Sequence, residues 1–306
     1  MLDFLRIEGI IQDYESFIKH SQIQFTTDIN LDSSELVPQY ENERYKWYYF
    51  KGKYQRYYLN LKQKICRLSG FSTYYLVISG SLHKNHHNGK NYTDFYYSDL
   101  MKEIQNISGL IYPISPEFAL RTIECGVNIE TEFIVYDYLA QYLLVYQGEQ
   151  FNRYNGKPHI GFEVELEKNY KVKIYDKCAQ NRLNTNLMRF EVHIDNMYNL
   201  HKLGIYKLND LLILENLLKL KKILISKFDK ILFCETTIHP LDKRHSEYYL
   251  KVSNPKYWQM LRTQKNNINY QNQVKKYELF KRKFCNNTKG ILREKIDQKF
   301  LELLNQ

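Results

Sequence analysis

The stretch Lys171–Ile194 constrains the fold most, because apolar and polar residues alternate with period two at both of its ends. It reads K-V-K-I-Y-D-K, then a polar linker, then L-M-R-F-E-V-H-I. Such alternation predicts two β-strands, each with one face toward a core. The other faces carry Lys173, Tyr175, Arg189, Glu191 and His193. If both apolar faces pack on one core, these five side chains form an open polar surface. A hydroxyl, a carboxylate and cations there suit phosphoryl transfer.

Composition indicates a globular protein. The chain has 306 residues, 43% of them hydrophobic, with 12 Gly and 6 Pro, which argues against disorder. No apolar run approaches the ~18 residues of a transmembrane helix. Asp3, Arg6 and Glu8 interrupt the N-terminal stretch, which argues against a signal peptide. We therefore expect a cytoplasmic protein and no membrane partner.

The five cysteines are odd in number and include no C-x-x-C pair. This spacing favours a reduced compartment and argues against a cysteine-based zinc site.

The charge of the chain indicates what kind of partner it binds. The net charge is +10, and residues 251–306 hold 13 Lys and Arg against 4 Asp and Glu. Such a basic segment attracts polyanions, which favours nucleic acid over the alternative of a solvated helix surface.

Two further segments have both an ordinary and a functional interpretation. Residues 40–67 interleave Tyr, Trp and Phe with Lys and Arg, which suits base stacking, but a pair of ordinary strands is favoured. Residues 71–82 predict a buried strand, and His83, His86 and His87 follow in an Asn- and Gly-rich stretch. Because that stretch predicts a loop, we expect exposed histidines rather than metal ligands.

The run Arg121–Glu130 alternates again and predicts a strand with Glu124, Gly126 and Asn128 on one face. A glycine between two oxygen-bearing side chains leaves room for a metal ion or a DNA backbone. An ordinary half-exposed strand is the alternative, and taken alone it is favoured. Three residues separate the run G-F-E-V-E-L-E from Lys171, so the two segments predict a hairpin.

The remaining segments predict mainly helices. They lie near residues 10–20, over 98–108, after Asp210, from Asn254 to about Cys285, and over 291–304. Residues 136–146 fit either a strand or a helix. The predicted fold is α+β, with a central, mainly antiparallel sheet, helices on one face and a basic helical C-terminal extension. We expect a catalytic domain over 1–250 and the extension over 251–306.

Several short motifs occur in an informative order. They are G-S-L-H-K, N-G-K-N, I-E-C-G-V-N-I, K-I-Y-D-K, R-F-E-V and L-H-K-L-G-I-Y-K-L-N-D-L, between Ser79 and Leu211. In this order they resemble the replication initiators of filamentous single-stranded DNA phages, the gene II protein type, and more distantly the initiators of rolling-circle plasmids.

The resemblance implies a DNA endonuclease and strand transferase that starts rolling-circle DNA replication. A tyrosine would attack a phosphate at the replication origin, form a covalent protein–DNA linkage and later rejoin the strand, with Mg²⁺ or Mn²⁺ as the cofactor. The partners implied are single-stranded or hairpin DNA and host replication proteins.

Carried onto this sequence, the resemblance assigns roles to seven residues. Tyr175 would be the nucleophile, and Lys177 and Arg189 would contact the phosphate. The implied metal ligands are Glu124 and Glu191, with Asn128 and His193 as additions. The chain departs from the pattern of many such initiators, because it has no His-hydrophobic-His pair.

Alternatives stay open at this point. With 28 tyrosines in the chain, Tyr92, Tyr170 or Tyr257 could be the nucleophile instead. Arg189 and Glu191 could form a simple ion pair. The alternative function is a non-catalytic nucleic-acid-binding protein, and a third is a structural phage protein that packages nucleic acid.

Overall fold

The structure is a computed structural model that describes residues 1–27, 36–111, 118–157, 159–166, 170–263 and 267–306. The chain forms two compact units. The first unit consists of Met1–Cys125, Ile194–Lys219 and Leu304–Gln306. The second unit consists of Gly126–His193 and Leu220–Leu303. Both units contain part of one strand, β6 (Ala119–Glu130), whose residues 119–125 belong to the first unit.

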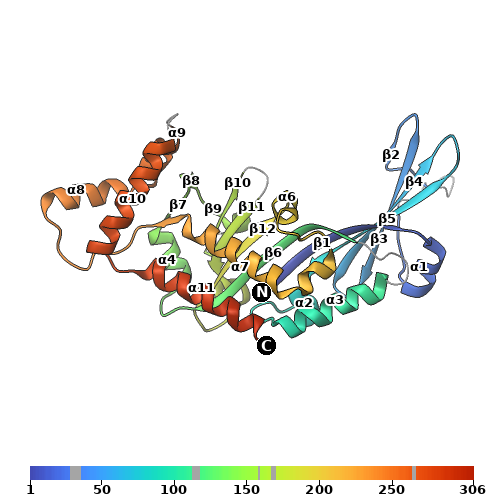
Figure 1. The fold of residues 1–306 in the computed structure, drawn as a ribbon, viewed down its shortest axis with the longest axis horizontal. Helices are drawn as coiled ribbons and strands as arrows, with labels where there is room; N and C mark the ends of the chain where they lie inside the picture. The colour runs from blue at the N-terminus through green and yellow to red at the C-terminus, as the bar shows by residue number, and fades with distance from the viewer. Residues whose placement is uncertain (28–35, 112–117, 158, 167–169, 264–266) are drawn as a thin grey trace. The chain divides into compact units, whose positions relative to one another are not determined.

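The sheet of the first unit has the strand order β2-β3-β4-β5-β1-β6, and the registered pairs are antiparallel (Figure 1). Its strands other than β6 are β1 (Leu2–Ile11), β2 (Tyr40–Glu41), β3 (Tyr45–Tyr54), β4 (Tyr57–Cys66) and β5 (Ser72–Ser81). The Tyr- and Lys-rich segment thus forms the β3–β4 hairpin, as the strand interpretation predicted.

One face of this sheet forms the core of the first unit. Alternating residues such as Leu5, Ile7, Leu61, Leu76 and Ile78 are fully buried. Helix α2 packs against β1 and α3, and α1 packs against α3. The helices and 3₁₀ turn of this unit are α1 (Tyr14–Ser21), α2 (Leu82–His86), α3 (Tyr97–Ile111), α6 (Tyr198–His201) and η2 (Leu208–Leu212).

The sheet of the second unit has the order β6-β12-β11-β10-β9. Its strands are β9 (Asn152–Arg153), β10 (Gly161–Leu166), β11 (Tyr170–Asp176) and β12 (Leu187–Ile194). The predicted hairpin is present, with Glu163 opposite Lys173 and Glu165 opposite Lys171. The predicted apolar face of β12 is buried. Phe190 on that face meets Phe228 of α7 (Leu214–Asp229) with ring centroids 5.0 Å apart.

A second, smaller layer completes this unit. The strands β7 (Leu143–Tyr146), β8 (Glu149–Gln150) and β13 (Ile231–Phe233) form a three-stranded sheet. Trp258 and Tyr277 are fully buried in one apolar cluster with residues of β7 and β13. The other helical segments of the unit are α4 (Val135–Tyr142), η1 (Tyr154–Gly156), α5 (Lys177–Asn181), α8 (Lys243–Val252), α9 (Pro255–Thr263), α10 (Asn267–Phe284) and α11 (Thr288–Leu304).

The predicted α+β class is confirmed, with a large antiparallel sheet and C-terminal helices. The N-terminal prediction was partly wrong: β1 occupies residues 2–11 and the expected helix begins only at Tyr14. Residues 136–146 contain both of the predicted alternatives, α4 and then β7. Residues 28–38, whose sequence also predicts a loop, lie mostly outside the described residues. The division at residue 250, which α8 crosses, stays a prediction.

The expected exposed loop histidines were a wrong prediction. His83 and His86 lie in α2, His83 is 2% exposed, and His86 and His87 are half-buried. Helix α2 begins because the Ser81 hydroxyl accepts the N–H of Lys84, a standard N-cap. Among the described residues no helix is both long and apolar enough to cross a membrane.

Candidate functional site

The polar faces of β11 and β12 meet at Glu191. Its Oε1 accepts a hydrogen bond from Lys173 Nζ at 3.0 Å, and its Oε2 accepts from Tyr175 at 3.4 Å and from Arg189 Nε. Arg189 Nη1 also donates to Asn128 Oδ1 of β6 at 3.0 Å. We call these five residues the Glu191 cluster. The structure thus brings together four of the five polar residues predicted from the two strands, and His193 lies two residues after Glu191 on β12.

The Glu191 cluster is buried, which corrects the expectation of an open polar surface. The exposed fractions are 1% for Glu191, 2% for Arg189 and 2% for Tyr175. Buried charges are tolerated when they are paired and hydrogen-bonded. Here the carboxylate of Glu191 holds two cations, so the ion pair that the sequence left open is present.

Two glycines set how closely the strands approach the cluster. A Cβ on Gly126 would lie 2.5 Å from the Cβ of Glu191, so the room predicted above this glycine is already filled by β12. A Cβ on Gly161 would lie 2.2 Å from the Cβ of Tyr175, its partner in the β10–β11 register. Both positions require glycine because the neighbouring strand is too near for any side chain.

The end of β11 places Lys177 beside Tyr175. Asp176 is the N-cap of α5, and its side chain accepts the N–H of Ala179 at 2.8 Å. Lys177 is therefore the first residue of the helix, and it is fully buried. Its Nζ lies 5.4 Å from the centroid of the Tyr175 ring and donates to Gln180 at 2.7 Å. The Y-D-K motif thus sets a cation beside the tyrosine ring.

Tyr154 covers one face of the Tyr175 ring. The two rings are stacked, with centroids 4.4 Å apart and planes 15° from parallel. Tyr154 belongs to η1, where Asn155 and Gly156 both have positive φ, 48° and 66°. A substrate that reaches the Tyr175 hydroxyl from this side would have to displace the ring of Tyr154.

Glu124, the other main residue predicted from the resemblance, lies on β6 in the first unit. Its carboxylate and that of Asp3 offer oxygens within 4.8 Å of each other, and the residues are 7% and 4% exposed. Two buried carboxylates this close suit a hard cation such as Mg²⁺ or Mn²⁺, which prefers oxygen ligands. We call this the Asp3–Glu124 pair.

The sequence analysis did not identify Asp3 as a candidate site residue, although two of the sequence motifs contact Asp3. Ser81 of G-S-L-H-K donates its hydroxyl proton to Asp3 Oδ1, and Asn91 of N-G-K-N donates to Oδ2 at 3.1 Å. Those motifs therefore act by holding a carboxylate. The signal that could have revealed Asp3 was its place in the alternating run of residues 2–11, for most of which no element was predicted.

The second face of the first unit's sheet combines rings and cations. We call it the aromatic–cation face, made up of Arg6, Tyr45, Trp47, Tyr49, Lys51, Lys53, Tyr58, Lys62, Lys64 and Tyr75. Lys64 Nζ lies 3.8 Å from the centroid of the Tyr45 ring and 5.3 Å from that of Trp47. The Trp47 and Tyr75 rings are 6.0 Å apart. All of these rings are half-buried or exposed.

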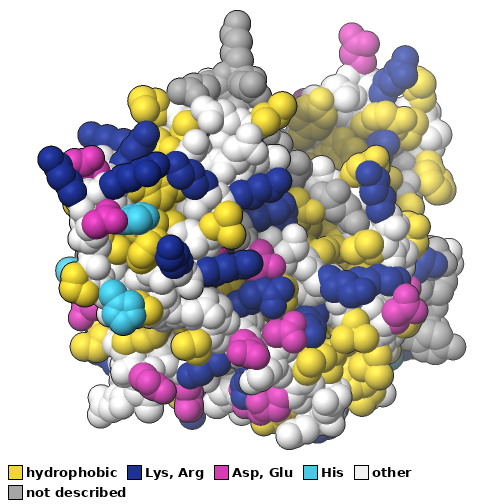
Figure 2. All heavy atoms as spheres, turned by 60° about the vertical axis from the view of Figure 1, so that its left-hand side comes forward, with side chains coloured by type: hydrophobic (Ala, Val, Ile, Leu, Met, Phe, Trp, Pro, Cys, Tyr) yellow, Lys and Arg dark blue, Asp and Glu magenta, His cyan; other side chains and the backbone are white. Residues whose placement is uncertain are grey.

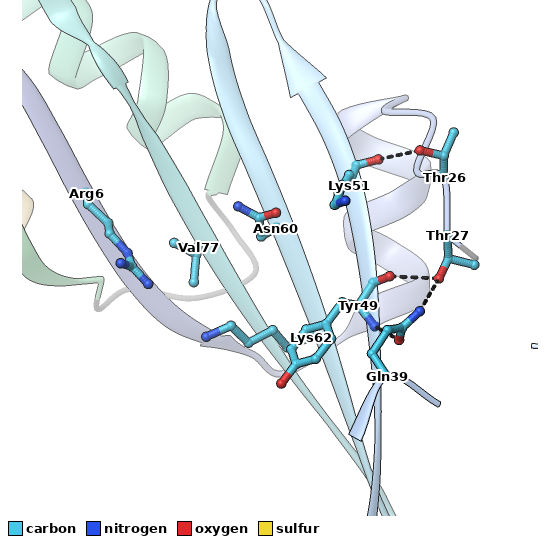
Figure 3. A pocket seen from close by; sticks show the side chains of 9 residues that line it. All are labelled: Arg6, Thr26, Thr27, Gln39, Tyr49, Lys51, Asn60, Lys62 and Val77. Atoms are coloured by element: carbon cyan, nitrogen blue, oxygen red, sulfur yellow. Dashed lines mark hydrogen bonds between the residues drawn. The ribbon is translucent and has the colours of Figure 1, made fainter. Parts of the chain in front are cut away.

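A hollow on this face brings cations together (Figure 3). It is lined by Arg6, Thr26, Thr27, Gln39, Tyr49, Lys51, Asn60, Lys62 and Val77. Lys62 also pairs with Glu8 at 3.3 Å. Cations beside partly exposed rings are the groups that hold the phosphates and bases of a single strand. The aromatic–cation face therefore suits a nucleic acid chemically.

The other tyrosines named from the sequence lie elsewhere. Lys227 Nζ is 3.6 Å from the ring centroid of Tyr170, and Tyr257 of α9 donates to Gln273 at 3.1 Å. Tyr92 lies between α2 and α3.

Basic residues of the C-terminal extension are partly paired within it, as in Lys281–Glu278 and Lys299–Glu302. Figure 2 shows Lys and Arg side chains across one face of the molecule, with acidic side chains among them.

No family model and no curated protein matches the sequence. The structure is similar to that of a rolling circle replication initiator protein from Geobacillus stearothermophilus, with a TM-score of 0.36 and 11% identity. The similarity covers 83% of this chain and 94% of that chain.

Proposed function

We propose that this chain initiates rolling-circle DNA replication by nicking and rejoining one DNA strand at an origin. The observation that carries the proposal is the Glu191 cluster, in which the hydroxyl of Tyr175 faces a carboxylate 3.4 Å away that also binds two cations. A third cation, Lys177, lies beside the Tyr175 ring. A tyrosine in the Y-D-K motif, with a proton acceptor and positive charge around it, is equipped to attack a phosphodiester.

The proposed step is an exchange of one phosphodiester bond for another. The Tyr175 oxygen forms a bond to phosphorus while its proton passes to the carboxylate of Glu191. The P–O3′ bond breaks and the departing oxygen takes a proton from water, which leaves a 3′-hydroxyl that can prime synthesis. In the later transfer a 3′-hydroxyl attacks the phosphotyrosine and forms the DNA phosphodiester. The bond between phosphorus and the Tyr175 oxygen breaks in the same step, and the tyrosine oxygen takes back a proton as the attacking hydroxyl loses its own. Lys177 and Arg189 would stabilise the charge on the phosphate oxygens.

The metal is the second part of the proposal. Within the cluster, the oxygens of Glu191 and Asn128 already accept hydrogen bonds from cations, which makes them weaker candidates as ligands. The Asp3–Glu124 pair fits a hard cation better, and His193 stays a proposed addition. Bound Mg²⁺ or Mn²⁺ would supply Lewis-acid polarisation of the phosphate.

The proposed partner is single-stranded or hairpin DNA from the origin in the cytoplasm, a phage-infected host included, with host replication proteins as further partners. The aromatic–cation face is the proposed contact for the strand. The burial of Tyr175 favours one alternative, a nucleic-acid-binding protein without chemistry, because that function needs only the aromatic–cation face.

A covalent-trapping experiment tests the proposal. The full chain is mixed with labelled single-stranded oligonucleotides that cover its own replicon, with Mn²⁺, and the products are separated on a denaturing gel. We expect a shifted, protease-sensitive band that EDTA removes and that Tyr175→Phe abolishes. Tyr170→Phe is the matched control, since it removes a hydroxyl from the same strand, and it should leave the band intact.

Other outcomes are equally informative. A band that survives Tyr175→Phe would retain the enzyme class and move the nucleophile to another tyrosine, with Tyr92 and Tyr257 tested next. A complete lack of covalent product, beside salt-sensitive binding that persists in EDTA, would replace the proposal with the binding protein.

A further inference from the structure

The histidine-rich segment after β5 plays no part in the function proposed above, although it forms a compact group in the first unit. The rings of His86 and His87 are 4.9 Å apart, and both meet Phe95, at 5.8 Å and 6.3 Å. His83 stacks on the same phenylalanine at 5.1 Å. The segment therefore folds its imidazoles inward around one aromatic side chain.

Three donor atoms converge beside this ring. The ligand atoms of His86, His87 and Asp99 all lie within 4.8 Å of one another, and His86 Nε2 is 3.0 Å from Asp99 Oδ1. Nε2 of His87 is buried and has no hydrogen-bond partner among the described residues. A buried nitrogen without a partner is costly, so this atom requires an explanation.

The surrounding residues orient the donors as the outer shell of a metal site does. Glu103 Oε1 lies 3.3 Å from Nδ1 of His86, and its Oε2 accepts from Tyr57 at 2.6 Å and from Asn85 at 2.7 Å. Asp99 Oδ2 accepts the N–H of Tyr96 at 3.1 Å. A ligating histidine usually donates its second ring N–H to a fixed carboxylate, which is the role open to Glu103.

We propose that His86, His87 and Asp99 bind one divalent transition metal ion of the zinc class. Two imidazoles and one carboxylate are a typical three-ligand set for Zn²⁺, whereas Mg²⁺ prefers oxygen alone. The ion would join α2 to α3, which carries Asp99. His86 lies between two carboxylates, 3.0 Å from Asp99 Oδ1 and 3.3 Å from Glu103 Oε1, and Lys102 Nζ lies 3.9 Å from Asp99 Oδ1.

The site is distinct from the Asp3–Glu124 pair in its residues and in its donor chemistry. The proposal therefore stands whether or not the chain nicks DNA. Excess Mg²⁺ distinguishes the two sites in an experiment, because Mg²⁺ occupies carboxylate sites such as the Asp3–Glu124 pair and competes poorly for imidazole ligands.

The test uses the full-length protein, stripped with a chelator and kept in excess Mg²⁺. Co²⁺ and Zn²⁺ are titrated, with visible absorption for Co²⁺ and competition against a chromophoric chelator for Zn²⁺. We expect one ion per chain. His87→Gln and Asp99→Asn should each lower the Zn²⁺ affinity at least about a hundredfold, and Glu103→Gln about ten- to a hundredfold. His159→Gln, a matched change at an exposed histidine of the second unit, should have no effect.

A thermal readout guards against loss of folding. Zn²⁺ should raise the Tm of the wild type and of His159→Gln but not that of His87→Gln. His87→Gln decides the result if the other variants fail to fold, because the ring nitrogen it removes makes no hydrogen bond among the described residues. Unchanged Zn²⁺ affinity in His87→Gln, or no uptake of Co²⁺ by the wild type, would overturn the proposal.

Discussion

The two units present polar sheet faces that follow the same alternation and differ in almost everything else. In the first unit, the aromatic–cation face leaves Lys51 and Lys53 exposed and its rings partly accessible. In the second unit, the side chains of Glu191 and Arg189 in the Glu191 cluster are each 2% exposed, and that of Lys173 is 14% exposed. Period-two alternation creates both faces, and the surrounding segments decide which of them solvent reaches.

The difference determines what each face can do. Exposed cations are screened and mobile, so they attract a polyanion without fixing its position. Buried, mutually bonded groups are held in one arrangement, as a reacting hydroxyl requires. We therefore expect the first unit's face to govern DNA affinity and the second unit's cluster to govern both stability and chemistry.

The largest expected effect is on stability. Glu191→Ala leaves Arg189 and Lys173 without their carboxylate in a buried site, and should lower the free energy of unfolding by about 3–5 kcal/mol. Glu8→Ala is the control on the other face, where the carboxylate pairs with Lys62 and Arg121. That partly exposed pairing should be worth at most about 1 kcal/mol. Urea unfolding measures the free energy of unfolding of both variants. Equal decreases in the two variants would contradict the difference between the two faces.

An intermediate effect is expected on DNA binding. Trp47→Ala removes a ring of the aromatic–cation face and should weaken binding of a short single-stranded oligonucleotide by about 1–3 kcal/mol. Tyr74→Ala takes a ring from the opposite face of the same sheet, where it stacks on Tyr14 at 4.2 Å, and should leave binding unchanged. Fluorescence anisotropy gives both affinities. A larger loss in Tyr74→Ala would show that the strand binds elsewhere.

The smallest effect concerns salt. Lys51→Gln removes one exposed cation beside the hollow of Figure 3. The slope of log affinity against log salt should become shallower by about 0.7 for a single strand, equally for all sequences. Lys19→Gln on α1 removes the same charge from an exposed site away from that face. If both variants change the slope alike, net charge rather than the aromatic–cation face controls binding.

The sequence predicted which side chains share a strand face more successfully than it predicted their burial. Contacts of Lys173, Tyr175 and Arg189 with Glu191 follow from alternation and strand adjacency. The stacking of the Tyr154 ring on Tyr175 could not be predicted, because Tyr154 belongs to a short 3₁₀ turn whose sequence has no periodic pattern.

Local composition misled where tertiary contacts prevailed. Asn and Gly around His83–His87 predict a loop, yet the Ser81 cap and the burial of Leu82 and His83 make a helix of it. At the N-terminus, the expected helix near residues 10–20 overlaps only the end of β1, and no element was predicted for residues 2–9. The pairing of β1 with β5 and β6 comes from distant segments. Asp3 was missed with that strand.

The stack of Tyr154 on Tyr175 has a kinetic consequence. If Tyr175 attacks DNA from the covered side, the turn that carries Tyr154 must first swing away, and that step does not depend on DNA concentration. At saturating DNA the rate of covalent linkage would then report the opening of one aromatic ring. A smaller side chain at residue 154 would raise that plateau while leaving the affinity for DNA unchanged.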